Sequence, residues 1–104
     1  MTNLEINQLL HERVMGECWH EIEPRDDGNL VRDYCIKCET FGVGSSLADY
    51  TNWPDYGPML EVAMTKEWWN DFAYYSNGDF KISTILNPLR GSTAMAEFVK
   101  ERVI

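Results

Sequence analysis

Basic residues are scarce in this sequence of 104 residues. Nine Lys and Arg stand against seventeen Asp and Glu, which gives a formal net charge of −8 and a pI near 4.6. Nucleic-acid-binding modules need Lys and Arg to neutralise phosphates, so this charge argues against direct nucleic-acid binding. Residues 1–50 carry ten acidic against four basic side chains, and residues 51–104 carry seven against five. A partner with a basic surface is therefore expected.

Long apolar runs are also missing. No stretch approaches the roughly 20 residues needed to cross a bilayer, and the first residues contain no basic stretch followed by an apolar one. The chain has no repeat, low-complexity tract or linker. We therefore expect a single domain over residues 1–104, located in the cytoplasm and without a membrane partner.

Cysteine is rare, and all three cysteines belong to one motif, Cys18-x-His20 followed by Cys35-x-x-Cys38. Zinc favours thiolate and imidazole ligands, and a structural site uses four of them. The two-residue spacer of the second pair lets both thiolates wrap one ion. A one-residue spacer in a strand would place Cys18 and His20 on the same face. The motif therefore predicts a structural zinc site with Cys18, His20, Cys35 and Cys38 as ligands.

Three other interpretations stay open. The cysteines could form one disulfide and leave a free thiol, although an odd count without a secretory leader argues against an oxidised, exported chain. They could be buried apolar side chains without a metal. His11 could replace His20 as the nitrogen ligand, but it lies in the middle of an apparent helix, where a solvent-facing side chain is expected.

Three helices are predicted from hydrophobic spacing and capping residues. Thr2 and Glu5 have capping-box spacing and predict a helix over residues 3–15, which Gly16 can end. Two prolines argue against regular structure over residues 54–58, so a second helix is expected over about 58–69. Ser92 is expected to cap the third helix. The inward side chains should be Leu60, Ala63, Met64 and either Trp68 or Trp69 in the second helix, and Met95, Phe98, Val99 and Val103 in the third.

Two hairpins are predicted between these helices. The first joins residues 18–22 to residues 30–35 through a turn over 24–29 and brings both ligand pairs to one end. The second joins residues 72–75 to 80–86 around Asn77-Gly78, a dipeptide that favours tight turns. The order α, ββ, α, ββ, α predicts an α+β fold. It would consist of a small antiparallel sheet of two hairpins, three helices packed on it, and a zinc ion that pins the first hairpin.

The arrangement resembles a family of small phage proteins, the phage ABA sandwich domain. The resemblance covers most of the chain and rests on Val14-Met15-Gly16, Cys18-Trp19-His20, the Cys35 and Cys38 pair, and Pro54-Asp55-Tyr56. It implies helices against a sheet, a phage or prophage origin, no established catalytic activity, and metal ligands at Cys18, His20, Cys35 and Cys38. The chain departs from the family pattern over residues 57–59 and 87–91, two loops expected to carry its specific function.

Catalysis is not expected, because four protein ligands leave zinc no position for water. Base deaminases combine His-x-Glu with Pro-Cys-x-x-Cys, whereas here Ile22 follows His20 by two residues and Tyr34 precedes Cys35. Glu21 or Glu23 could act as a base, but carboxylates beside a hairpin turn are expected to be solvated. The sequence therefore predicts a protein that is not an enzyme.

Aromatic residues are concentrated over residues 53–75. Exposed Trp and Tyr are favoured interface anchors, although packing of these rings into the core is the simpler expectation. Together with the acidic hairpin, they provide the candidate partner-binding residues Glu21, Glu23, Asp26, Asp27, Trp53, Tyr56 and Trp69.

Two functions fit these observations. The first is a phage-encoded, non-catalytic inhibitor of a host defence protein. It would be similar to the small acidic anti-CRISPR proteins that bind an RNA-guided nuclease and block loading of target DNA by occupying a basic surface. The second is a phage structural or housekeeping protein that binds another phage protein. The charge favours the first, which would act in the host-cell cytoplasm.

Overall fold

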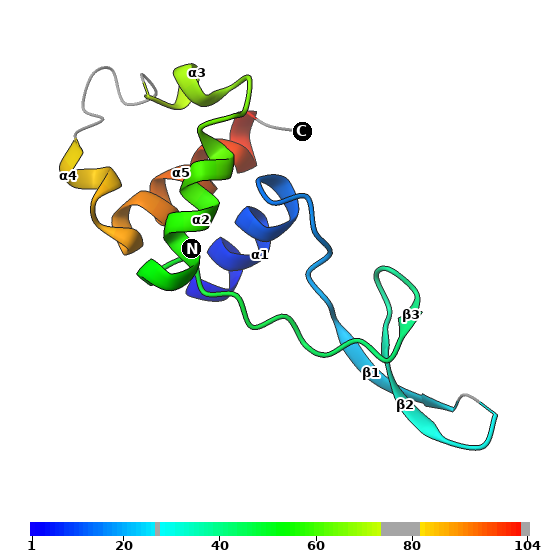
Figure 1. Cartoon of the computed structure of the whole chain (residues 1–104). Helices are drawn as coiled ribbons and strands as arrows, with labels where there is room; N and C mark the ends of the chain where they lie inside the picture. The colour runs from blue at the N-terminus through cyan, green and yellow to red at the C-terminus, as the bar shows by residue number, and fades with distance from the viewer. Residues whose placement is uncertain (27, 74–81, 103–104) are drawn as a thin grey trace. The chain divides into compact units, whose positions relative to one another are not determined.

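The computed structural model describes residues 1–26, 28–73 and 82–102 (Figure 1). Its elements are α1 (Asn3–Arg13), β1 (Ile22–Asp26), β2 (Val31–Cys35), β3 (Thr40–Phe41), α2 (Trp53–Ala63), α3 (Trp69–Ala73), α4 (Ile82–Ile85) and α5 (Pro88–Arg102).

The chain forms two compact units. The helical unit comprises Met1–Gly16 and Ala48–Ile104, and the strand unit comprises Glu17–Leu47. The predicted α+β class with an antiparallel sheet is confirmed, but the sheet of the described residues has three strands in the order β1-β2-β3 rather than the two predicted hairpins. The single domain over residues 1–104 stays a prediction, because a compact unit need not fold by itself.

Helix α1 begins where its capping box predicts. The Thr2 hydroxyl accepts a hydrogen bond from the Glu5 N–H at 3.2 Å, which satisfies one of the unpaired donors of the first turn. The helix ends at Arg13, two residues before the predicted end, and Gly16 follows with a φ of 71°. Ile6, Leu10 and Val14 are buried, so one face of α1 enters the core.

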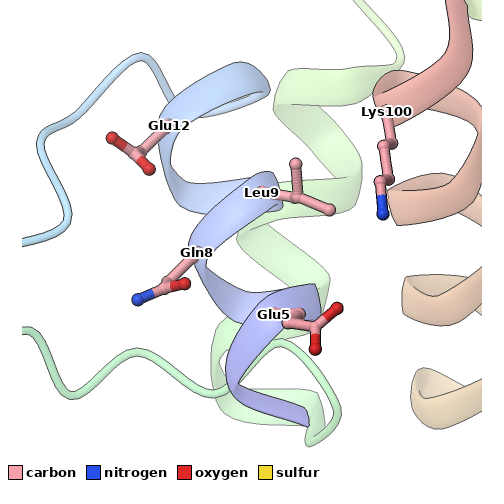
Figure 2. Close-up of a pocket in the computed structure, with 5 residues that line it drawn as sticks. All are labelled: Glu5, Gln8, Leu9, Glu12 and Lys100. Atoms are coloured by element: carbon pink, nitrogen blue, oxygen red, sulfur yellow. The ribbon is translucent and has the colours of Figure 1, made fainter. Parts of the chain in front are cut away.

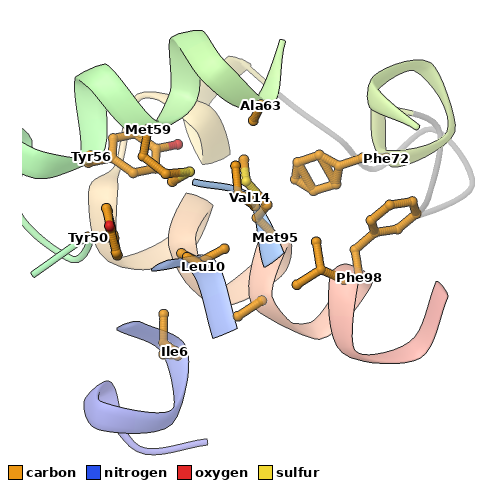
Figure 3. Packing of buried hydrophobic residues seen from close by; sticks show 12 residues of the cluster. Ile6, Leu10, Val14, Tyr50, Tyr56, Met59, Ala63, Phe72, Met95 and Phe98 are labelled. Atoms are coloured by element: carbon orange, nitrogen blue, oxygen red, sulfur yellow. The ribbon is translucent and has the colours of Figure 1, made fainter. Parts of the chain in front are cut away.

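The core of the helical unit is formed between helices (Figure 3). Helix α1 packs against α5, and α2 and α4 also contact α5. Every residue of this core belongs to the helical unit. The predicted packing of three helices on a sheet stays a prediction. The buried members are Ile6, Leu10, Val14, Tyr50, Tyr56, Met59, Ala63, Phe72, Met95, Ala96, Phe98 and Val99.

Helix α2 begins at Trp53, five residues before the predicted start. Pro54 lies in the first turn, where its missing N–H would have no helical partner anyway. Pro58 lies inside the helix, and it follows Gly57, which has no Cβ to clash with the proline ring. The two prolines are therefore compatible with a helix, and the prediction that residues 54–58 are irregular is wrong.

The earlier start changes which side chains α2 buries. Tyr56, Met59 and Ala63 are fully buried. Leu60 packs against the edge of the core, but Met64, predicted inward, is 57% exposed. Trp68 and Trp69, which follow the helix, both pack partly buried against the core.

The predicted second hairpin is wrong at both of its described ends. Residues Trp69–Ala73 and Ile82–Ile85 are helical, and the predicted turn at Asn77-Gly78 lies outside the described residues. The Phe72 N–H donates a hydrogen bond to the carbonyl of Trp68, four residues earlier, as in an α-helix. Phe72 also packs on Phe98 with ring centroids 5.4 Å apart, a tertiary contact that local sequence does not reveal.

Helix α5 begins at Pro88, four residues before the predicted cap. Asn87 Oδ1 accepts a hydrogen bond from the Arg90 N–H at 3.1 Å, as an N-cap does, so the prediction of Ser92 as the cap is wrong. Ser92 is buried inside the helix, and its hydroxyl donates to the Leu89 carbonyl. The inward positions of Met95, Phe98 and Val99 are confirmed, and Val103 lies outside the described residues.

In the strand unit, β1 pairs with β2 from Ile22↔Cys35 to Asp26↔Val31, and β3 pairs with β2 on the other side. The predicted first strand over residues 18–22 is wrong, because Cys18 and His20 precede β1. Pro24, predicted to open the turn, lies within β1. An edge strand tolerates proline, since one side of it makes no ladder bonds.

Candidate metal centre

The four predicted ligands form one cluster. The ligand atoms of Cys18, His20, Cys35 and Cys38 all lie within 4.8 Å of one another. Cys35 ends β2, Cys38 lies in the turn between β2 and β3, and Cys18 and His20 come from the segment before β1. The grouping of the predicted Cys3His set is therefore confirmed.

The β2–β3 turn shapes the cysteine pair. Its closing bond runs from the Glu39 N–H to the Cys35 carbonyl at 2.8 Å. The backbone N–H groups of Lys37 and Cys38 donate to the Cys35 sulfur. Glu39 adopts a φ of 57°, which returns the chain into β3. The two-residue spacer thus folds into a turn that surrounds one sulfur with donors.

The β1–β2 ladder brings the other two ligands beside this turn. Ile22 pairs with Cys35, and the Ile36 N–H continues the ladder by donating to the Glu21 carbonyl at 3.0 Å. His20 is therefore held close to the cysteine pair. The His20 N–H also donates to the Ser46 hydroxyl at 3.0 Å, which fixes the backbone of this ligand.

The distances within the cluster match those of a tetrahedral zinc site. Zn–S bonds of about 2.3 Å and Zn–N bonds of about 2.0–2.1 Å imply S···S separations of about 3.8 Å and S···N separations of about 3.6 Å. The Cys18 and Cys35 sulfurs are 3.9 Å apart, and the Cys38 sulfur is 3.5 Å from His20 Nδ1. Three sulfurs and one imidazole nitrogen are also the donors that zinc prefers.

The alternatives fit less well. The 3.9 Å between the Cys18 and Cys35 sulfurs is far from the roughly 2.05 Å of a disulfide, and all three cysteines are free. Cys35 is buried, but Cys18 is half-buried and Cys38 is exposed, unlike three apolar core residues. His11 Nδ1 lies 2.6 Å from the Tyr50 hydroxyl oxygen in the helical unit. His11 is thus half-buried rather than solvent-facing, and it does not belong to the cluster.

The cysteines differ in acidity. Burial, together with neighbouring Cys35 and Cys38, raises the pKa of Cys18 to about 11. Burial also acts to raise the pKa of Cys35, but donors outweigh it and lower that pKa to about 6. These donors are the Cys38 N–H, the His20 ring, the Lys37 N–H and the Cys38 thiol. A metal ion therefore meets one thiol that ionises easily and another that needs the metal's charge to lose its proton.

The strand unit has little apolar core. Its buried apolar side chains among the described residues are Trp19, Tyr34 and Cys35. Chains shorter than about 40 residues usually need disulfides, metals or a partner to hold a fold. A metal at the cluster would join the turn, the end of β2 and the segment before β1.

Two contacts near the ligands were not predicted. The Ser46 hydroxyl accepts from the His20 N–H, and the Thr40 hydroxyl lies 3.4 Å from the Cys38 sulfur. Thr40 follows Cys38 by two residues, so its proximity was recognisable from spacing. Ser46 lies 26 positions after His20, and no local signal reveals it.

The candidate acidic residues do not share one face. Glu23 and Asp26 lie in β1 three positions apart, so their side chains point to opposite faces of the sheet. Glu23 also pairs with Arg25, with Oε1 and Nε 2.5 Å apart. Glu21 is exposed just before β1, and Asp27 lies outside the described residues.

The three candidate aromatic residues differ in how deeply they are buried. Trp53 is 50% exposed, and its ring packs edge-on against Tyr56. Tyr56 is fully buried, and its hydroxyl donates to the Ile85 carbonyl at 2.7 Å, so it cannot offer its ring to a partner in this fold. Trp69 is half-buried against Phe72. Trp53 is therefore the most exposed of the three candidate aromatic residues.

A shallow depression of about 240 Å³ opens between α1 and α5 in the helical unit (Figure 2). Leu9 points towards α5 in this view. The lining offers two carboxylates, one amide and one ammonium group, from Glu5, Glu12, Gln8 and Lys100. It contains no hydroxyl, thiol or imidazole. Across the ranges 1–26, 28–73 and 82–102, no helix is both long and apolar enough to cross a membrane.

Comparison of this chain with protein-family models, with curated proteins and with solved structures finds no significant match.

Proposed function

We propose that the strand unit binds one structural zinc ion through Cys18, His20, Cys35 and Cys38. The observation that carries this proposal is the close grouping of three sulfurs and one imidazole nitrogen at tetrahedral separations. The small apolar core of the unit supports a structural role, because metal binding would contribute folding free energy there. The zinc would hold the turn and the ladder together.

Zinc content tests this site directly. Purified protein should contain about one zinc per chain by inductively coupled plasma mass spectrometry. His20→Asn should lose the metal, whereas His11→Asn, which removes the other histidine, should keep it. Less than about a tenth of a zinc per wild-type chain after growth in zinc-replete medium would refute the site.

Cobalt substitution separates a structural site from a catalytic one. With four protein ligands, the cobalt form should show the intense visible absorption of a tetrahedral thiolate site, unchanged by added azide or cyanate. A spectrum that shifts with these anions would indicate an open position, and the proposal of a closed site would fail.

We further propose that the chain is a phage-encoded, non-catalytic inhibitor of host defence, of the anti-CRISPR type. It would occupy the basic surface of an RNA-guided nuclease and block loading of target DNA. The charge of the strand unit supports this: residues 17–47 carry seven acidic against three basic side chains, a difference of −4. Zinc with three thiolates adds a further −1. Such an acidic surface is complementary in charge to the Lys and Arg side chains with which a nuclease binds the phosphates of DNA.

The inhibitor proposal is tested with a purified Cas9–guide RNA complex. The chain should bind this complex in the absence of target DNA, and pre-bound target DNA should reduce binding. Affinity should fall as salt rises, because exposed charges are screened over about 10 Å at 0.1 M salt. If neither Cas9 nor other RNA-guided nucleases bind at low salt, the inhibitor proposal gives way to a phage protein that binds another phage protein.

A further inference from the structure

The β1–β2 hairpin has two chemically different faces. Residues paired across antiparallel strands point to the same side of the sheet, and successive residues alternate. One face, here called the covered face, carries Glu23, Arg25, Arg32 and Tyr34, and Phe41 of the neighbouring strand β3 lies on the same side as its partner Tyr34. The other, here called the open face, carries Pro24, Asp26, Val31 and Asp33 in its exposed part.

On the covered face, the apolar rings are shielded by the hairpin's own cations. The guanidinium carbon of Arg25 lies 4.1 Å from the centroid of the Tyr34 ring, and that of Arg32 lies 5.9 Å from the centroid of Phe41. The two rings contact each other with centroids 4.7 Å apart. Such cation–π contacts stabilise the hairpin and leave little bare apolar surface. Glu23 is occupied by its ion pair with Arg25.

The open face has no such cover. Val31 is 71% exposed, and it is paired across the strands with Asp26. Pro24 is exposed and paired with Asp33. Within the described part of the chain, the carboxylates of Asp26 and Asp33 make no hydrogen bond or ion pair. Leu30, in the turn before β2, is 68% exposed. The face therefore combines unneutralised carboxylates with bare apolar side chains.

We propose that the open face is the docking surface for a basic protein partner, with Lys or Arg side chains meeting Asp26 and Asp33 around an apolar contact to Val31. This proposal rests on the proposed protein-binding function and assigns it to one side of the hairpin. An apolar centre bordered by charges is a common arrangement in protein interfaces.

The negative charge of the open face favours a basic protein over the other possible binding partners. A second copy of the chain would bring four carboxylates together on the two open faces, and the whole chain carries −8. Phosphates of nucleic acids and anionic lipid surfaces would be repelled for the same reason. A cationic protein surface gains two ion pairs and covers Val31.

The exposed edge of β1 offers a less suitable contact than the open face. A partner strand adding to β1 would need donors along that edge, and Pro24 in the middle of the strand has no N–H. The partner is therefore expected to contact side chains of the open face rather than extend the sheet.

The test uses two fluorescent peptides of equal charge, one alternating Lys with Leu and the other alternating Lys with Ser. Fluorescence anisotropy at low salt should show that the zinc-loaded wild-type chain binds the Leu peptide more tightly. Asp33→Lys should weaken this binding by about five- to tenfold, because attraction becomes repulsion. The matched reversal Glu23→Lys on the covered face should weaken it by less than about threefold. Val31→Thr should remove the preference for the Leu peptide.

Several outcomes would overturn the proposal. Equal losses for Glu23→Lys and Asp33→Lys would mean attraction to net charge alone. Absence of peptide binding at low salt, or a dimer of the wild-type chain that Asp33→Lys alters, would exclude a basic protein partner at this face. Zinc content and circular dichroism must match wild type in each variant. The Cas9 experiment separates the two proposals: nuclease binding unaffected by Asp33→Lys refutes the open face alone, whereas peptide binding without nuclease binding refutes the inhibitor proposal alone.

Discussion

Gly91→Ala should destabilise the helical unit, although alanine is the better helix former. Gly91 lies in α5 directly against the buried ring of Tyr56. A Cβ added at this position would overlap the Tyr56 hydroxyl oxygen and lie 2.8 Å from its Cζ and 3.1 Å from the Thr84 carbonyl oxygen. The ring cannot move away cheaply, because Tyr56 is fully buried and its hydroxyl donates to the Ile85 carbonyl.

The size of the effect follows from three opposing contributions. Forcing extra volume into a packed core costs about 1–3 kcal/mol. Breaking the bond from Tyr56 to Ile85 and leaving the hydroxyl buried costs about 1–3 kcal/mol more. Replacing glycine by alanine inside a helix returns up to about 1 kcal/mol. The net loss should lie within about 1–6 kcal/mol, with a central value of about 3 kcal/mol, which lowers the melting temperature of a chain of this size by roughly 12–24 °C.

Thermal and urea unfolding monitored by circular dichroism measure this loss. Gly44→Ala is the control, since nothing lies within 4 Å of its added Cβ, and its effect should stay within about 0.5 kcal/mol. Tyr56→Phe removes the closest atom, so it should cost less in the Gly91→Ala background than in wild type. A Gly91→Ala variant as stable as wild type would refute the close packing of Tyr56 on Gly91.

Three further predictions concern the metal, the acid stability and the start of α5. Cys38→Ser should abolish zinc binding and increase amide hydrogen exchange over residues 17–47. The helical content should persist, because the helical core contains no residue of the strand unit. Unchanged hydrogen exchange would show that the metal is dispensable. Hydrogen bonds hold the pKa of Asp49 below its usual range, although burial acts to raise it. The donors are the Thr51 hydroxyl, the Thr51 N–H and the side chains of Asn52 and Asn7. The resulting stabilisation is full above the unfolded pKa of about 3.9 and is lost as the pH falls through the lower folded value. The melting-temperature gap between wild type and Asp49→Asn should therefore be constant above about pH 5 and narrow on acidification. Asn87→Ala should cost about 1 kcal/mol in chemical unfolding through loss of the α5 cap, and a neutral result would contradict the cap.

The features that could be predicted from sequence are those with short-range causes. The cap of α1 depends on Thr2 and Glu5, three residues apart, and the structure has it as predicted. The ligand set depends on rare residue types at fixed spacing, so the grouping of Cys18, His20, Cys35 and Cys38 was also recognisable. In both cases, the relevant contacts lie within the motif or between two halves of one hairpin.

The errors arose where a local signal was outweighed by packing. Pro54 and Pro58 indicate irregular structure when considered alone, but burial of Tyr56 and Met59 favours a helix through both. Phe72 was predicted in a strand, yet its contacts with Trp68 and Phe98 hold it in helix α3. Phe98 lies 26 positions after Phe72, and no pattern of residue spacing reveals this contact.

The two units differ in what stabilises them, and this difference bears on function. The helical unit buries a cluster of apolar side chains from several helices, whereas the strand unit buries Trp19, Tyr34 and Cys35 and relies on cation–π contacts and the ligand cluster. The strand unit carries −4 of the chain's formal net charge of −8 on only 31 of its 104 residues, and this dense negative charge is self-repulsive and opposes folding of the unit. A metal that joins its segments would offset that repulsion, so a surface as acidic as the open face becomes possible on a unit of only 31 residues. On this reasoning, zinc affects partner binding through the order of the hairpin and without touching the partner. Removing zinc should therefore weaken binding as much as reversing the charges of the open face.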